Sequence, residues 1–300
     1  MNLKEIQTEG VNPNTRNIDQ LSTLDMVTLV NNEDKKVAEA VELELPNIAK
    51  AVDTIAGQMR NGGRLIYSGC GTSGRLGVLD ASECPPTFST EPEQVQALMA
   101  GGMGAMFKAV EGAEDNFEMG KEDLRKINFC EKDVLVGIAA SGRTPYVLGA
   151  LEYARECGAP TISLSCCPGS AVTKVSDIAI APMPGPEVVT GSTRLKSGTA
   201  QKMVLNMLST CTMIRLGKVY GNLMVDVKAS NAKLICRCER IVSLATGISE
   251  EKAATYLQQC DYRPKTAIVM VECGVDAQKA LALLAEFDGR IADVIAAVRG

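Results

Sequence analysis

Short apolar runs alternate with amphipathic stretches along the middle of the chain. Four apolar runs are predicted to be buried strands, at residues 64–68, 133–139, 161–165 and 177–181. Between them, apolar positions recur at helical spacing, which predicts helices at residues 74–83, 115–127 and 145–157. Strands and helices that alternate in this way form a parallel sheet with helices on both faces. The pattern therefore predicts an α/β fold for this part of the chain.

The segment before this region has a different pattern. About the first twenty residues are polar, with a turn signal at residues 12–14 (NPN), and we expect an extended arm there. A helix is then expected from residue 45, where Pro46 suits the first turn, to Gly62.

Beyond the α/β region the chain is predicted to be helical. A long apolar helix is expected at residues 196–216, and no convincing strand follows Gly221. Short amphipathic helices are expected at residues 228–246, 250–259, 264–271 and 276–287. The chain is therefore expected to comprise an N-terminal arm with helices (1–54), an α/β domain (55–218) and a small C-terminal helical domain (219–300).

Composition narrows the chemistry of the protein. The 300 residues include no histidine, which excludes Ser-His-Asp and Cys-His catalytic pairs, imidazole acid–base catalysis and metal sites that need an imidazole ligand. With 31 basic and 36 acidic residues the net charge is −5, which argues against nucleic-acid binding because phosphate neutralisation needs a basic face. Proton transfer near neutral pH must therefore come from carboxylates, cysteine, lysine, tyrosine or water.

The cysteines and the N-terminus indicate the compartment. Eleven cysteines include an adjacent pair (Cys166 and Cys167) and one C-x-C but no C-x-x-C, so no zinc spacing is present and most thiols are expected to be small buried groups. Residues 1–6 lack the pattern of a signal peptide, and no apolar stretch reaches the roughly 18–20 residues of a membrane span. The sequence predicts a cytosolic protein with reduced thiols, no bound metal and no membrane contact.

The first candidate site follows the first predicted strand, at residues 68–77 (SGCGTSGRLG). Its glycines permit close backbone approach, the helix that follows presents free N–H groups, and Thr72 and Ser73 add hydroxyl donors that suit a phosphate monoester. The segment lacks the G-K-[ST] of a Walker loop. It matches G-x-G-x-x-G, but no acidic strand end follows as a dinucleotide site requires. Taken alone, the segment is better explained as a tight strand-to-helix turn.

A second loop of the same kind follows the next predicted strand, at residues 139–145 (AASGRTP). Ser141, Gly142 and Thr144 precede a proline that suits the first position of a helix. Two such loops at the carboxyl ends of parallel strands face one crevice, where open α/β sheets bind ligands. The pair therefore indicates a site for a phosphorylated small molecule.

Two acidic segments supply candidate acid–base groups. A helix that ends at the Pro-Pro pair of residues 85–86 places Glu83 in its last turn. Residues 110–116 (VEGAEDN) contain Glu114 and, as the expected helix N-cap, Asp115. Taken separately, each segment is better explained as a solvated surface group. Because the chain has no histidine, however, two carboxylates are the obvious acid–base pair, one ionised and one held protonated by its surroundings.

A fifth segment, residues 190–202 (TGSTRLKSGTAQK), combines hydroxyl groups with three cations at a helix start. The hydroxyls of Ser192 and Thr193 and the nearby cations could complete an anion site or mark a subunit contact. A basic helix start without a binding role explains the segment equally well.

Taken together, these five segments resemble the N-acetylmuramic acid 6-phosphate etherases, a bacterial family of the sugar isomerase (SIS) superfamily. The similarity extends along the whole chain and includes residues 18–24, 76–88, 110–115, 136–146, 190–201 and 217–227. It implies an SIS-type three-layer α/β sandwich with a parallel sheet and a small C-terminal helical domain. It also implies a homodimer with active sites near the subunit interface. Cys70 and Cys167 depart from the family pattern, in which alanine and asparagine are expected.

The resemblance implies a reaction and its residues as well. The D-lactyl ether of N-acetylmuramic acid 6-phosphate is cleaved to N-acetylglucosamine 6-phosphate and D-lactate, without a cofactor, metal or covalent nucleophile. Glu83, in the motif ASECPP, matches the family's acid, and Glu114, in EGAED, matches the base; the sequence itself does not fix which is which. Phosphosugar contacts carry over to Thr72, Ser73, Ser141, Gly142, Thr144, Ser192 and Thr193.

Two other function classes share many of these features. A phosphosugar isomerase on the same fold would keep the loops and carboxylates but move a proton between C1 and C2, and it would release no lactate. A non-catalytic phosphosugar sensor would bind the sugar phosphate without consuming it and would use the helices after residue 220 to contact a protein partner. The presence of both glutamate motifs argues against the sensor.

Overall fold

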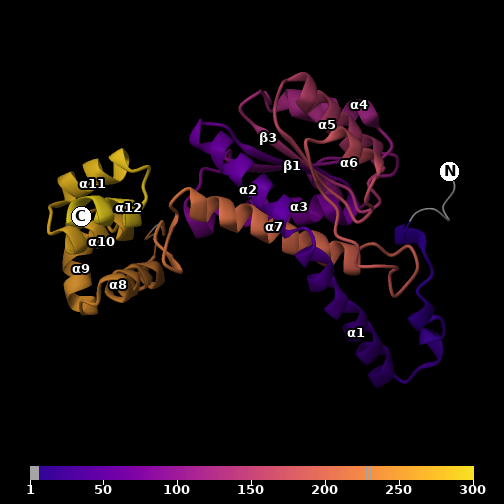
Figure 1. The fold of residues 1–300 in the computed structure, drawn as a ribbon, viewed down its shortest axis with the longest axis horizontal. Helices are drawn as coiled ribbons and strands as arrows, with labels where there is room; N and C mark the ends of the chain where they lie inside the picture. Colours follow the sequence, from indigo (N-terminus) through magenta and orange to yellow (C-terminus); the bar gives the residue numbers. More distant parts are fainter. Residues whose placement is uncertain (1–6, 228, 230) are drawn as a thin grey trace. The chain divides into compact units, whose positions relative to one another are not determined.

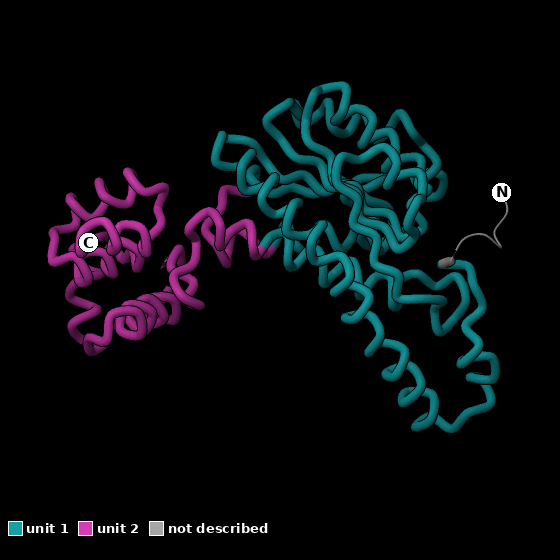
Figure 2. Tube along the Cα trace, viewed as in Figure 1, with its two compact units in different colours: residues 1–82, 93–209 teal, residues 83–92, 210–300 magenta. Residues whose placement is uncertain are grey.

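The computed structural model describes residues 7–227, 229 and 231–300. Residues 1–6, which carry the signal-peptide argument, lie outside the described residues, as do residues 228 and 230 of the helix predicted at 228–246. The chain forms two compact units, coloured separately in Figure 2. The first unit comprises the chain up to residue 82 and residues 93–209, and the second comprises residues 83–92 and 210–300.

A parallel sheet of five strands forms the centre of the first unit (Figure 1). In chain order the strands are β1 (Leu65–Gly69), β2 (Val95–Met99), β3 (Val134–Ile138), β4 (Thr161–Leu164) and β5 (Ile178–Ile180). They lie in the order β2-β1-β3-β4-β5. Every residue of β1, β3 and β4 is buried, as expected for strands covered on both faces. The predicted α/β fold with a parallel sheet is confirmed.

Strand β2 is not predicted from the sequence. It lies at the edge of the sheet and pairs only with β1, with Val95 beside Leu65. Only Val95 and Met99 of this strand are buried, so it lacks the continuous apolar run that marks the central strands.

Helices cover both faces of the sheet. Figure 1 shows α4, α5 and α6 on one face and α2, α3 and α7 on the other, which makes three layers. The helices of this part of the chain are α1 (Thr23–Glu42), α2 (Leu45–Arg60), α3 (Gly71–Phe88), α4 (Phe117–Lys126), α5 (Pro145–Glu156), α6 (Ala171–Val175) and α7 (Lys196–Arg215). On the first face, Ile66 and Leu135 of the sheet pack with Leu124 of α4 and Leu151 of α5 in one buried apolar cluster.

Two helix ends differ from the prediction. Helix α3 does not stop at the Pro-Pro pair but continues to Phe88, because proline's fixed φ is compatible with a helix and Cys84 and Phe88 bury their side chains. Helix α4 is capped by Asn116 rather than by Asp115. The Asn116 backbone is extended (φ −90°, ψ 95°), and its side chain accepts a hydrogen bond from the amide of Met119.

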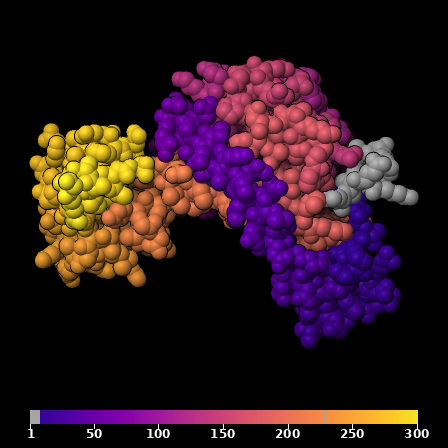
Figure 3. All heavy atoms as spheres, viewed as in Figure 1, coloured from indigo at the N-terminus to yellow at the C-terminus, as the bar shows by residue number. Residues whose placement is uncertain are grey.

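The N-terminal segment is not the extended arm that its polar sequence predicts. Residues 7–20 form three short 3₁₀ turns, and Asn12 is 3% exposed. The side-chain amide of Asn12 donates to Glu33 Oε2 (2.9 Å), and the hydroxyl of Thr15 donates to the main-chain oxygen of Val188 (2.9 Å). Figure 3 shows this segment beside α1 at the surface of the first unit. Asn12 and Thr15 therefore serve as hydrogen-bond partners rather than as solvated groups.

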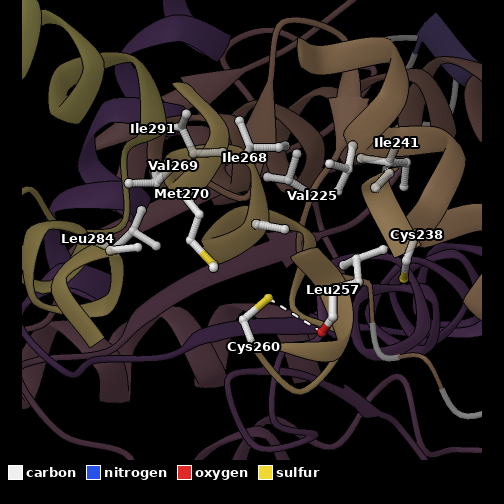
Figure 4. Close-up of a cluster of buried hydrophobic side chains, with 14 of the residues drawn as sticks. Val225, Cys238, Ile241, Leu257, Cys260, Ile268, Val269, Met270, Leu284 and Ile291 are labelled. Carbon is white, nitrogen blue, oxygen red and sulfur yellow. Dashed lines mark hydrogen bonds between the residues drawn. The ribbon is translucent and has the colours of Figure 1, made fainter. Parts of the chain in front are cut away.

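The second unit is mainly helical. Its own helices are α8 (Ala232–Thr246), α9 (Glu250–Gln258), α10 (Pro264–Cys273), α11 (Ala277–Glu286) and α12 (Ile291–Arg299). They enclose a separate apolar core that includes Ile241, Leu257, Ile268 and Leu284 (Figure 4). The prediction misses α12 and a hairpin of two very short strands, β6 (Val219–Tyr220) and β7 (Leu223–Met224). The expected domain limits at residues 54 and 218 stay a prediction.

The cysteines and the helices bear on two further expectations. All eleven cysteines are free; five are buried, four are half-buried, and Cys211 and Cys236 are exposed. The expectation that most thiols are buried is therefore met only in part. None of the helices in the described part of the chain combines the length and apolar character needed to span a membrane.

Candidate functional site

The two predicted ligand loops leave neighbouring strands. Strands β1 and β3 lie side by side with Gly69 opposite Ile138, and β2 lies on the other side of β1. The chain therefore passes from β1 to β2 on one side and then to β3 on the other side of β1, so the strand order reverses between β1 and β3. Open α/β sheets bind ligands at this kind of reversal, outside the carboxyl ends of the strands.

The first loop is unusually tight. The amide of Gly74 donates to the main-chain oxygen of Cys70 (3.1 Å), and a Cβ on Gly74 would lie only 2.6 Å from the oxygen of Gly69. No side chain fits there, so a glycine is required. Helix α3 begins within this loop, with Thr72 half-buried and Ser73 buried in its first turn. The N-terminal amides of α3 and these two hydroxyls therefore lie at the end of β1.

The second loop packs against the loop that follows β4. Gly142 has a φ of +65°, and a Cβ at this residue would lie 2.1 Å from the Ser170 hydroxyl oxygen. Ser141 and Thr144 are half-buried. The side chain of Thr144 makes no capping hydrogen bond to α5, although the residue stands at the N-cap position. Its hydroxyl is therefore not used to close the helix.

The start of α7 lies against the first loop. The Ser73 hydroxyl donates to Gln201 Oε1 (2.9 Å), and a Cβ on Gly198 would lie 3.5 Å from Thr72 Cγ2 and 3.6 Å from the main-chain oxygen of Thr193. Gln201 is 1% exposed, and its Nε2 has no hydrogen-bond partner among the described residues. The structure thus brings part of the fifth predicted segment to the first loop. Ser192 is half-buried in the turn that precedes α7.

The cations of that segment are not all available to an anion. Lys196 is 1% exposed and forms an ion pair with Glu33 (2.8 Å). Glu187 accepts hydrogen bonds from the amides of Lys196 and Ser197 (2.9 Å each) and from the Ser197 hydroxyl (2.8 Å). The N-terminus of α7 and the Lys196 charge are therefore satisfied inside the first unit. An anion site in this segment cannot use the ammonium group of Lys196.

A cavity of about 320 Å³ joins Glu114 to the first loop. This volume is at the lower end of the range for small-molecule sites, which is about 300–1,000 Å³. The cavity is lined by Cys70, Gly71, Arg75, Met99, Ala100, Ala105, Ala109, Val110, Glu111, Gly112, Ala113 and Glu114. The amide of Tyr146, in the first turn of α5, donates to the main-chain oxygen of Glu114 (3.0 Å). The Glu114 backbone is thus fixed beside the end of the second loop, while its side chain is exposed.

The thiol of Cys70 belongs to the same cavity as Glu114. Burial, and after it the negative charges of Glu114 and Asp115, raise the pKa of Cys70 to about 12. A thiol with so high a pKa stays protonated near neutral pH and is a poor nucleophile. The cavity therefore offers carboxylates, rather than a thiolate, for chemistry.

The other candidate acid, Glu83, is exposed on α3 and belongs to the second unit. Its pairing with Glu114 therefore stays a prediction.

Sequence reasoning gave no role to two residues that the structure places at this site. Arg75 lines the cavity with Glu114, and Gln201 contacts Ser73. Both lie within segments chosen for their hydroxyl groups. Their spacing from those hydroxyls along a helix is the only signal that could have found them.

Comparison with known proteins identifies the family of this chain. Residues 47–155 match the family model of the glucokinase regulatory protein N-terminal SIS domain, and residues 106–210 match that of the SIS domain. The chain is 59% identical over 299 residues to the N-acetylmuramic acid 6-phosphate etherase of Photorhabdus laumondii subsp. laumondii, which covers 100% of this chain and 99% of the relative. The chain belongs to the N-acetylmuramic acid 6-phosphate etherase family.

Further relatives of this etherase family and a solved structure extend the comparison. The family member from Aliivibrio fischeri is 59% identical over 295 residues, with 98% of each chain covered. A putative phosphosugar isomerase involved in capsule formation from Bacteroides fragilis has a TM-score of 0.50 at 23% identity, and the match covers 66% of this chain and 94% of that structure. This likeness shows that the chain shares its fold.

Proposed function

We propose that this chain cleaves the D-lactyl ether of N-acetylmuramic acid 6-phosphate and releases N-acetylglucosamine 6-phosphate and D-lactate. The observation that carries the proposal is the identity of 59% over the full length with a relative of that name. The cavity supports the proposal, because Glu114 and residues of the first loop line it together.

The chemistry follows from the substrate. An alkoxide is a poor leaving group for direct hydrolysis, but in the open-chain sugar the C1 aldehyde makes the C2 proton acidic. Glu114 removes this proton, and Glu83 protonates the lactyl oxygen as its bond to C3 breaks, which leaves an unsaturated aldehyde and lactate. Water then adds its oxygen at C3, and C2 regains a proton. Each positioned proton transfer contributes about 10²–10⁴ in rate.

The phosphate is held without a paired cation in this proposal. The hydroxyls of Thr72, Ser141 and Thr144 and the free amides at the start of α3 bind its oxygens, and Ser192 and Thr193 complete the site. Ser73 contributes its main-chain amide, because its hydroxyl donates to Gln201. The tight first loop and the two neighbouring strands support this assignment, since a helix N-terminus with its free N–H groups favours an anion. Gly142 lets the second loop lie close to Ser170, because it has no side chain to collide with the Ser170 hydroxyl.

The assembly and location complete the proposal. We expect a homodimer with its active sites near the subunit interface, working in the cytoplasm in amino sugar catabolism and cell-wall recycling. The expectation of a dimer rests on the family resemblance.

Heavy-oxygen water tests this function directly. The purified protein is incubated with N-acetylmuramic acid 6-phosphate in H₂¹⁸O, and both products are analysed by mass spectrometry. Elimination followed by water addition puts the label at C3 of the amino sugar and leaves lactate unlabelled. Label in lactate would contradict the elimination route, and the absence of any lactate would favour an isomerase or a sensor.

A further inference from the structure

One cation faces the cavity beside Glu114. Among the described residues that line the cavity, Arg75 is the only basic one, whereas Glu111 and Glu114 are acidic. A ligand group with a negative charge would be repelled by the two carboxylates unless a cation binds it. The single positive charge of Arg75 therefore determines whether an anionic group can enter.

The guanidinium group of Arg75 is held in one orientation. Its Nε donates to the main-chain oxygen of Met106 (2.9 Å), and its Nη2 donates to that of Ala105 (2.8 Å). These two bonds use one edge of the planar group, and Nη1 makes no hydrogen bond to a described residue. The edge formed by Nη1 and the second hydrogen of Nη2 thus remains for a ligand. This edge matches the two oxygens of a carboxylate.

The neutral partners of Arg75 are also informative. Main-chain carbonyl oxygens orient the guanidinium group but do not cancel its charge. In an arginine that served only to pair with an acid, a carboxylate would take this place. The full charge of Arg75 is therefore kept beside the cavity.

We propose that Arg75 binds the carboxylate of the lactyl group and so selects the lactyl ether over the unsubstituted sugar phosphate. This inference rests on the proposed function. A base that removes the C2 proton lies next to C3, which carries the lactyl ether, so the lactyl group of the bound substrate lies in the cavity of Glu114. The phosphate, at the other end of the sugar, is left to the hydroxyls of the two loops.

The test compares two ligands that differ only in the lactyl group. In Arg75→Gln, the KM for N-acetylmuramic acid 6-phosphate rises by about 10- to 100-fold, the usual value of a charge-assisted hydrogen bond. The inhibition constant of N-acetylglucosamine 6-phosphate, which has no lactyl group, stays within about twofold of that of the wild type. Arg75→Lys recovers only part of the loss, because an ammonium group cannot form the paired bonds.

Lys108→Gln is the matched control. Lys108 is an exposed cation two residues after Met106, in the segment whose main-chain oxygens hold Arg75, and it does not line the cavity, so its loss leaves both constants unchanged. An equal rise of both constants in Arg75→Gln would show that Arg75 only holds the loop, and no change in either would show that it does not bind the substrate. Both results overturn this inference. A wild-type protein that releases no lactate would instead overturn the proposed function.

Discussion

Two groups of charged side chains in the first unit have opposite surroundings. In the buried group, Glu33 and Lys196 are 4% and 1% exposed, and Glu33 also accepts hydrogen bonds from Asn12 and Asn14. In the cavity group, Glu114 is exposed and Arg75 is bonded to main-chain oxygens. The buried charges are fully occupied by partners within the protein, whereas the cavity charges remain available to a ligand.

The pKa of Glu33 illustrates the difference. Burial alone would raise this pKa, but hydrogen bonds from Lys196, Lys36 and the two asparagines outweigh burial and lower it to about 2. Four partners therefore hold Glu33 ionised. We therefore expect the buried group to stabilise the fold, and we propose that the cavity group carries the chemistry. Four experiments test this difference.

The largest effect is expected at Glu114. In Glu114→Gln, kcat falls by about 10²–10⁴ because the base is lost, while the free energy of unfolding stays within about 0.5 kcal/mol of that of the wild type since the side chain is exposed. Steady-state lactate release and urea unfolding measure the two quantities. Glu111→Gln, a neighbouring exposed acid in the same cavity, is the control with a smaller effect on kcat. Wild-type turnover in Glu114→Gln would remove this residue from the mechanism.

At Lys196 we expect a loss of stability rather than a loss of catalysis. Lys196→Met leaves Glu33 buried with only Lys36 as a charged partner and lowers the free energy of unfolding by about 3 kcal/mol, the lower part of the range for breaking a buried pair. Because a buried pair replaced by apolar groups costs little, the double variant Glu33→Met/Lys196→Met recovers much of the loss. Urea unfolding measures both. If Lys196→Met unfolds like the wild type but binds substrate poorly, Lys196 belongs to the binding site and not to the group that stabilises the fold.

The buried group also makes stability depend on pH. The folded-state pKa of Glu33 is about 2 and the ordinary value is 4.5, so its stabilisation is complete above about pH 4.5 and is lost as the pH falls toward 2. The loss amounts to about 3 kcal/mol. Unfolding free energies measured from pH 5 to 2.5 show this slope in the wild type and a shallower one in Glu33→Gln. Parallel slopes would show that Glu33 is not the titrating group.

A smaller effect is expected at the second loop. Gly142→Ala adds a Cβ 2.1 Å from the Ser170 hydroxyl at a φ of +65°, so the loop must move. We expect a loss of stability of about 1–3 kcal/mol and a higher KM. Gly158→Ala is the matched control, because Gly158 has a φ of +78° but open space around its Cβ position. If both variants raise KM equally, the close approach of the second loop does not position ligand groups.

The sequence is informative where a single physical signal dominates. Continuous apolar runs predict the buried strands β1, β3 and β4, and glycine and hydroxyl residues after two of them predict the ligand loops. The edge strand β2 is not predicted, because only its two end residues are buried and it therefore has no continuous apolar run. Helix α3 passes through its prolines because packing of Cys84 and Phe88 outweighs the lost hydrogen bonds, which a local pattern does not reveal.

The charged residues are harder to assign from the sequence. The linear pattern offers Lys196, in the fifth segment, as an anion-binding cation and gives Arg75 no role, yet Lys196 pairs with Glu33 and Arg75 lines the cavity. The partner of Lys196 lies 163 positions away in the chain, so only the tertiary structure separates the two. Glu114 likewise cannot be chosen over its acidic neighbours by composition, and the family motif selects it.

Hydrogen exchange at C2 of the sugar shows whether Glu114 removes the C2 proton during the reaction. With the reaction run in D₂O, we expect N-acetylglucosamine 6-phosphate formed by the wild type to carry one deuterium at C2. We expect Glu114→Gln to form this labelled product at a rate lower by about 10²–10⁴. Product formed without deuterium at C2, or formed at the wild-type rate by Glu114→Gln, would contradict this role of Glu114.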